Sequence, residues 1–264
     1  MINKALLLFS VITLGCFRIY ASDTIFEQEI TDEIVNSRPS GEIIWLNAGE
    51  QQFLGLFDEA KTKAVQGAAL ILPGVGEHPQ SKQLIVPLRE QLAEFGWTSL
   101  TIQLPVLRVV DNPQDAYVLI GKARERIKTA IEFLKKKELE NLVLIGHGFG
   151  ARTAVDFQFA IKENDIRALV VIGLSVPEFD IDKPTLLEQL GQIEIPVLDI
   201  YGAAEHPRIS ASFDQRKKAT RKNASFRQVE IDGADHQFNG NNDLLGKTIY
   251  GWIRNVAPGV EITK

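Results

Sequence analysis

The sequence is almost free of sulfur: its 264 residues include one cysteine, Cys16, and one methionine, Met1. A single thiol can neither form an intramolecular disulfide nor complete a cysteine-based zinc site, so disulfide scaffolds and zinc fingers are excluded. Excess positive charge is also missing, because 29 Lys and Arg residues face 34 Asp and Glu residues, which gives a net charge of -5. That balance argues against a protein that binds duplex nucleic acid through a basic surface.

What is present is an apolar share of 45% and a charged share of 24%. These values are typical of a globular domain and exclude a disordered or collagen-like chain. No internal repeat or low-complexity segment is visible. We therefore expect one domain with a sizeable hydrophobic core.

The N-terminus has the features of an export signal over residues 1–21. Lys4 precedes an apolar run, Ala5 to Phe17, that is too short to span a bilayer comfortably. Ile19 and Ala21 suit the third and first positions before a cleavage site, which would make Ser22 the first residue of the mature chain. The sequence therefore predicts an exported protein, periplasmic or otherwise associated with the cell envelope.

Two alternatives to cleavage are weaker. The apolar run could be retained as a membrane anchor. Cys16 could instead carry a lipid, but Thr13 stands where a bacterial lipoprotein signal usually has leucine. Cleavage after Ala21 would leave a mature chain without sulfur, which suits an oxidising compartment.

An acidic segment, residues 22–41, follows the signal, and in it Phe26, Ile30 and Ile34 recur every four residues, as on one face of a short helix. The main domain is expected over residues 42–257, with a tail at 258–264. It begins with two short runs, Ile43 to Leu46 and Gln52 to Phe57, separated by turn residues, which predicts an antiparallel hairpin.

Strands then alternate with helices. Six short runs rich in branched residues predict buried parallel strands: Ala68 to Leu72, Thr98 to Ile102, Leu142 to Ile145, Ala168 to Ile172, Val197 to Tyr201 and Arg227 to Ile231. The segments between them include three with apolar residues at helical spacing, around Leu84 to Phe95, Ile120 to Leu134 and Ala151 to Ile161. The fold class is therefore α/β: a doubly wound, mostly parallel eight-stranded sheet with an N-terminal hairpin.

In such sheets, ligands bind beyond the carboxyl ends of the strands. Four of these loops contain all four histidines of the chain: Leu72 to His78, Gly146 to Gly150, Gly202 to His206, and Gly233 to Phe238. The histidines could form a metal site. They come from separate loops with no close pair such as His-x-x-x-His, however, so no metal and no cofactor is expected.

The strand order, the Gly-rich turn Gly146 to Gly150, an acid after the seventh strand and a histidine after the eighth resemble the α/β-hydrolase fold. The chain is similar, more narrowly, to an uncharacterised group of exported bacterial proteins of this fold that lack the nucleophile serine. That likeness rests on the Pro-Gly-x-Gly-x-His-Pro loop from Pro73, on Gly96-Trp97 and on the Gly-His-Gly turn. The segment Ile172 to Ile195 is too short for a large lid.

The resemblance assigns roles to particular residues. Gly148 stands at the nucleophile position of the Gly-x-Ser-x-Gly elbow, where it offers no hydroxyl. Glu205 and His236 match the other two triad positions as a residual dyad. The oxyanion loop of the family matches Pro73 to Gly76. The candidate ligand-binding residues are Gly74, Val75, Gly76, His78, His147 and Phe149.

Other readings of two motifs stay open. The stretch Gly146 to Ala151 also fits the dinucleotide pattern G-x-G-x-x-G/A, but it lies deep in the chain, and the next strand is followed by no carboxylate. A basic run could contact an anionic membrane surface or an acidic protein, or could be the solvated face of a helix: Arg216, Lys217, Lys218, Arg221 and Lys222.

The sequence favours a non-catalytic α/β-hydrolase-like protein, a binding or scaffold module of the bacterial cell envelope that takes an envelope protein or a small ligand. One alternative is a periplasmic hydrolase of an ester or acyl substrate that uses Glu205 and His236 with activated water or with a serine such as Ser81 or Ser175. Another is a structural subunit of an envelope assembly such as a secretion apparatus.

Overall fold

The structure is a computed structural model that describes residues 22–110, 112–162, 165–177 and 184–259. The predicted export signal, residues 1–21, and most of the tail, residues 260–264, lie outside the described residues. Within them, no helix is long and apolar enough to cross a membrane.

The centre of the molecule is an eight-stranded sheet with the order β1-β2-β4-β3-β5-β6-β7-β8. The first two pairings, β1 with β2 and β2 with β4, are antiparallel, and all others are parallel. The fold class predicted from the sequence is confirmed. The strands are β1 Glu42–Ala48, β2 Gln51–Asp58, β3 Gly67–Leu72, β4 Trp97–Ile102, β5 Leu142–His147, β6 Ile166–Ile172, β7 Val197–Gly202 and β8 Phe226–Ile231.

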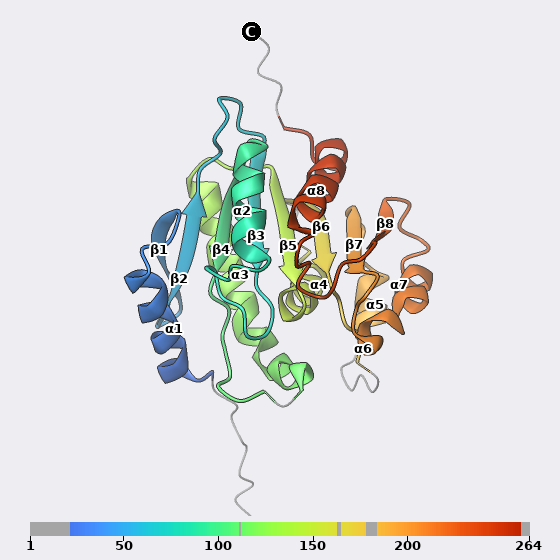
Figure 1. The fold of residues 1–264 in the computed structure, drawn as a ribbon, viewed down its shortest axis with the longest axis horizontal. Helices are drawn as coiled ribbons and strands as arrows, with labels where there is room; N and C mark the ends of the chain where they lie inside the picture. The colour runs from blue at the N-terminus through green and yellow to red at the C-terminus, as the bar shows by residue number, and fades with distance from the viewer. Residues whose placement is uncertain (1–21, 111, 163–164, 178–183, 260–264) are drawn as a thin grey trace, which may run out of the picture.

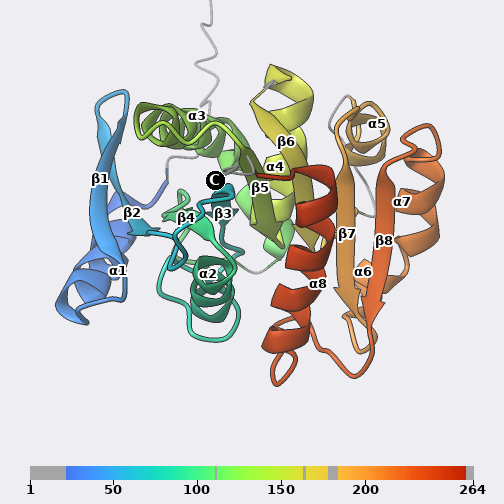
Figure 2. The ribbon, with the colours of Figure 1, turned by 90° about the horizontal axis from the view of Figure 1, so that it is seen from above.

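Helices cover both faces of this sheet (Figures 1 and 2). Seen from above, α3, α4 and α5 lie on one face, and α2 and α8 on the other. The helices are α1 Thr24–Asn36, α2 Ile85–Glu94, the 3-10 helix η1 Pro113–Leu119, α3 Ile120–Lys136, α4 Phe149–Ile161, α5 Leu186–Leu190, α6 Pro207–Ser210, α7 Phe213–Ala219 and α8 Asn242–Val256.

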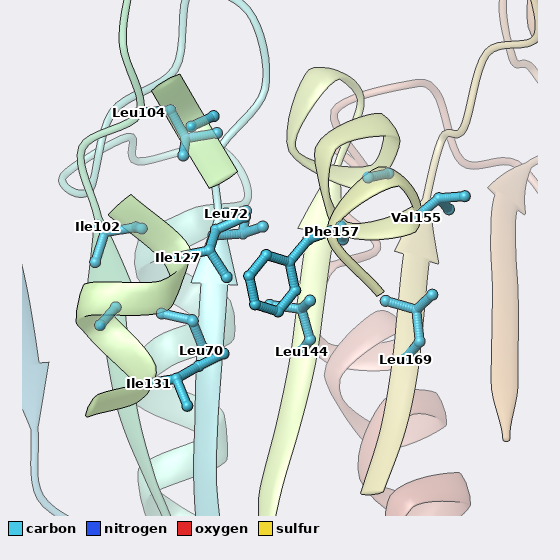
Figure 3. Packing of buried hydrophobic residues seen from close by; sticks show 14 of the residues in the cluster. Leu70, Leu72, Ile102, Leu104, Ile127, Ile131, Leu144, Val155, Phe157 and Leu169 are labelled. Carbon is cyan, nitrogen blue, oxygen red and sulfur yellow. The ribbon is translucent and has the colours of Figure 1, made fainter. Parts of the chain in front are cut away.

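The two faces of the sheet bury separate hydrophobic clusters, because alternate side chains of a strand point to opposite faces. In β3, Leu70 and Leu72 contribute to the cluster under α3 and α4, whereas Ala69 and Ile71 contribute to the cluster under α2 and α8. Figure 3 shows the first cluster, in which Phe157 of α4 lies over the sheet. A strand covered on both sides must be apolar throughout, which explains the continuous runs in the sequence.

Helix α1 packs on one face of the sheet at its antiparallel end. Its Ile34 is buried against Leu54 and Leu56 of β2. The carboxylate of Glu27 forms an ion pair with Arg126 of α3, with Oε1 2.6 Å from Nη1, and both side chains are buried. The acidic segment is therefore folded onto the domain that follows it.

The basic run of the sequence is divided by the fold. Arg216 lies inside the domain, where its Nε donates to Asp199 at 2.8 Å and its Nη1 donates to the carbonyl oxygen of Leu174. Placing Arg216 in a surface contact was therefore wrong, because α7 turns this side chain toward β7. Lys217, Lys218, Arg221 and Lys222 are exposed.

Candidate binding site at the carboxyl edge of the sheet

Between β5 and α4 the chain makes a sharp turn at Gly148, whose φ is +51° and ψ is −111°. Its N–H donates to the carbonyl oxygen of Ile172 at 2.9 Å. Two residues on, Gly150 must be glycine, because a Cβ there would overlap the carbonyl oxygen of Leu72. This close approach lets α4 begin directly above the sheet.

Position 148 is not crowded in this way. A Cβ on Gly148 would lie 3.7 Å from Nε2 of His236 and 3.8 Å from Cα of Gly74, which are ordinary van der Waals separations. A small side chain there would point toward the His236 ring. Position 148 therefore has the space for a small side chain, and Gly148 provides none.

Glu205, after β7, and His236, after β8, form the first of two acid–imidazole pairs. Glu205 Oε1 lies 2.7 Å from His236 Nδ1. The two groups are not aligned for a hydrogen bond, and Glu205 Oε2 also has no partner among the described residues. Burial disfavours the carboxylate, but the contact with His236 outweighs it and lowers the pKa of Glu205. The side chain of His236 is 36% exposed, so its Nε2 edge can meet a ligand.

The second pair, Glu77 and His147, is buried. Glu77 Oε2 lies 2.8 Å from His147 Nδ1 and also accepts the Gly74 N–H at 2.6 Å. On the other side of the ring, His147 Nε2 lies 3.0 Å from the carbonyl oxygen of His236. Burial opposes both charges, but their attraction and hydrogen bond outweigh it, so the pKa of His147 is raised and that of Glu77 is lowered.

These loops surround a pocket of about 400 Å³. One wall is aromatic: the rings of Tyr117 and Phe149 are nearly parallel, with centroids 6.5 Å apart. The pocket is lined by Gly74, Val75, Asn112, Gln114, Tyr117, His147, Gly148, Phe149, Gly173, Ser175, His206, Arg208, Ile209, His236 and Gln237.

The structure does not bring all predicted site residues together. Gly76 and His78 border a different hollow, beside α1, together with Ser81. The Oγ of Ser81 accepts the N–H of His78 there, at 2.9 Å. Burial lowers the pKa of His78. In the part of the chain that the structure describes, no group of three or more His, Cys, Asp or Glu is placed to hold a metal ion.

Sequence reasoning missed Glu77 as the partner of His147. Its position in the Gly-rich loop after β3 was visible, but a contact across 70 residues leaves no local pattern. It also missed the outer lining, in particular Asn112, Gln114 and Tyr117 near η1 and Arg208 on α6. These residues follow β4 and β7 along the chain, but they lie outside the four histidine-containing loops that the sequence pointed to.

Solved structures of hydrolases share this architecture. Est1E from Butyrivibrio proteoclasticus has a TM-score of 0.65 at 14% identity, over 82% of this chain and 98% of that chain. The dienelactone hydrolase from Anabaena variabilis has a TM-score of 0.67 at 19% identity, over 83% and 99%. A lidless α/β serine hydrolase from Xanthomonas campestris has a TM-score of 0.62 at 15% identity, over 84% and 98%. At these identities the likeness establishes the α/β-hydrolase fold alone.

Comparison with families gives one match over most of the chain. The sequence model of "Protein of unknown function (DUF3530)" matches residues 26–117 and 111–255. No curated protein matches the sequence.

Proposed function

Because the chain belongs to DUF3530, a family of proteins of unknown function with no assigned activity to carry over, we propose its function from the site: it is a non-catalytic α/β-hydrolase-fold protein that binds its ligand in the pocket above Gly148. The observation that carries the proposal is the missing side chain at Gly148, next to the close pair of Glu205 and His236.

The size of the catalytic loss supports binding over turnover. Removal of the serine of a working triad has lowered turnover by about a million-fold in a serine protease. His236 can still polarise a hydroxyl or water, but the elbow supplies no atom for a covalent acyl intermediate. A site with this geometry holds a ligand far better than it transforms one.

The lining of the pocket indicates the kind of ligand. Tyr117 and Phe149 offer an apolar wall that suits an acyl chain or a ring. The inner end presents the first turn of α4, whose N–H groups have no intrahelical partners, and the Nε2 edge of His236. A ligand with an apolar body and a terminal carbonyl or carboxylate oxygen satisfies both ends.

We place this binding module in the cell envelope, on the export signal read from residues 1–21. The exposed basic residues of α7 and the following turn give it a surface for an anionic membrane or an acidic protein partner. With Arg216 buried, this surface consists of Lys217, Lys218, Arg221 and Lys222.

The test is turnover of nitrophenyl esters of short and long acyl chains by the mature protein and by three variants. We expect no turnover by wild type and measurable turnover by Gly148→Ser, because the new hydroxyl lies near Nε2 of His236. Gly49→Ser is the matched control: Gly49 also has a positive φ and open space, but it lies in the β1–β2 hairpin. Turnover by wild type that His236→Ala abolishes would overturn the proposal.

One observation favours a second candidate, a hydrolase with a displaced nucleophile. Ser175 lines the same pocket as His236, whereas Ser81 borders the other hollow. If wild type is active, loss of turnover in Ser175→Ala would assign the hydroxyl. Retained turnover in that variant would assign water activated by His236.

A further inference from the structure

The imidazole of His147 connects three loops that are far apart in the sequence. It contacts Glu77 in the loop after β3, and it contacts the backbone of His236 in the loop after β8. His147 itself ends β5 at the elbow. Its side chain is 2% exposed, so solvent does not supply other partners.

The two contacts of the His147 ring require a proton on each side of it. A carbonyl oxygen only accepts hydrogen bonds, so Nε2 of His147 must carry a proton that it donates to His236. Nδ1 and Glu77 Oε2 lie 2.8 Å apart, and without a proton between them a lone pair would face a carboxylate. The arrangement therefore needs a second proton, shared by Nδ1 and Oε2.

The surroundings place that second proton on the ring. The negative charge of Glu77, together with that of Glu205, raises the pKa of His147 against the effect of burial. Glu77 also accepts the N–H of Gly74, which favours its ionised form. The His236 ring, 4.5 Å away between centroids, is the other titratable group that faces it.

We propose that Glu77 and His147 form a protonation-dependent clamp that positions the Gly74 loop and the backbone of His236 on either side of Gly148. His147 is thus a positioning residue. The clamp rests on the proposed function only because it concerns the same pocket. It would shape that pocket whether the protein binds its ligand there or hydrolyses it.

Burying the Glu77–His147 pair costs free energy, which argues that the pair does more than fill space in the core. Glu77 Oε1 is buried and has no partner within the described ranges. An apolar pair of the same size would avoid this unsatisfied oxygen, and buried ion pairs seldom stabilise a fold better than such a replacement. What apolar side chains cannot do is hold a backbone N–H and a backbone carbonyl of two different loops in one fixed relation.

The clamp is switched by pH in a defined direction. Loss of the shared proton as the pH rises through the raised pKa of His147 leaves only one of its two contacts satisfied. We then expect the loops around Gly74 and His236 to move more freely. Ligand affinity would then fall, because Gly74 and His236 line the pocket.

The decisive experiment is ¹⁵N NMR of the histidine side chains in the mature protein, with His147 assigned by its loss in His147→Asn. We expect an imidazolium pattern, with two slowly exchanging ring protons, near pH 7. Singly protonated His147 in the wild type at that pH would overturn the clamp. This measurement needs no other variant, no ligand and no turnover, so it stands apart from the ester assay.

A second arm tests the positioning role with Glu77→Gln, which keeps the shape and removes the charge. We expect backbone hydrogen exchange in residues 73–77 and 234–238 to become about tenfold faster. Glu27→Gln, the same change in the buried pair with Arg126, is the matched control and should leave both loops unaltered. Unchanged exchange in Glu77→Gln would contradict the proposal.

Discussion

At the scale of single residues, two glycines of one turn have different reasons to be glycine. Gly150 is fixed by a backbone that passes too close for any Cβ. A Cβ at Gly148 would make only ordinary contacts, so just the positive φ of +51° opposes a side chain there. A hydrolase accepts that strain in order to expose its nucleophile. In this chain the strained turn holds a glycine, which offers no hydroxyl.

This difference predicts unequal effects of alanine. Gly148→Ala should cost about 1–3 kcal/mol of unfolding free energy, the range for one residue held in a strained conformation. Gly150→Ala should cost about 3 kcal/mol or more, because α4 or β3 must move to relieve the overlap with Leu72. Urea unfolding of the two variants measures both values. Equal losses would mean that the elbow is not packed as described.

The buried Glu77–His147 pair predicts a pH dependence of stability. The pKa of His147 is raised above 6.5, so its contribution is complete below pH 6.5 and is lost as the pH rises through the folded-state pKa. The pKa of Glu77 is lowered from 4.5, so its contribution is complete above pH 4.5 and is lost as the pH falls through the folded-state pKa. The pair therefore stabilises most between these two values.

The comparison of wild type with His147→Asn measures this effect. The difference in unfolding free energy should be largest at about pH 5–6 and should shrink by about pH 9. Lys61–Glu94, an exposed pair far from the site, supplies a control: Lys61→Ala should give a small difference at both pH values. A difference between wild type and His147→Asn that grows with pH would show that the ring is neutral in the folded protein.

At the scale of elements, strands were predictable and their partners were not. The runs from Ala68 and Leu142 are apolar at every position, and only a strand covered on both faces needs that pattern. Element ends moved by a residue or two, as with β1, which continues to Ala48 because it still pairs with Gln51. These shifts follow from hydrogen bonds to neighbouring strands, which one strand's sequence does not contain.

The candidate site was predictable to the extent that the fold class places loops at one edge of the sheet. Glu205 and His236 lie together because β7 and β8 are neighbours in parallel. The other residues needed the tertiary structure: Tyr117 and Arg208 reach the pocket from separate elements, and Glu77 reaches His147 from the loop after β3. The basic run led to one wrong prediction, a surface position for Arg216. Its sequence neighbours are also basic, but α7 directs Arg216 into the domain.

Helix α1 gives a prediction for an element. Glu27→Ala would leave Arg126, 1% exposed, as a buried charge without its counter-ion, and we expect a loss of about 3–5 kcal/mol. Arg108→Ala, which breaks the exposed pairs with Asp23 and Glu29, should change the stability little, because solvent screens exposed ion pairs. Thermal unfolding compares the two variants. A small loss of stability in Glu27→Ala would mean that α1 is held by its apolar face alone.

At the scale of the whole molecule, the charges and the pocket lie on different parts of the surface. The four exposed basic residues occupy α7 and the turn after it, next to β8 at one edge of the sheet. The pocket opens at the carboxyl ends of the central strands. On the proposed function, a partner at the basic surface and a ligand in the pocket would contact different residues of the protein.

The cleavage site that the sequence predicts also concerns the whole molecule. Ser22 is 4% exposed, and its Oγ accepts the N–H of Val106 at 3.2 Å. Asp23 then caps α1 by accepting the N–H of Phe26 at 2.9 Å. Cleavage after Ala21 would keep both contacts, whereas a start at Thr24 would lose them.

If the chain is exported and cleaved as the sequence predicts, its intact mass should be that of residues 22–264. A chain engineered to begin at Thr24 should be less stable by about 1–2 kcal/mol, the usual cost of a lost helix cap. A mass that includes a lipid on Cys16 would replace cleavage after Ala21 with lipid anchoring. In that case residues 17–21 would link the folded domain to the membrane, and the basic surface would act beside a lipid layer to which the protein is already attached.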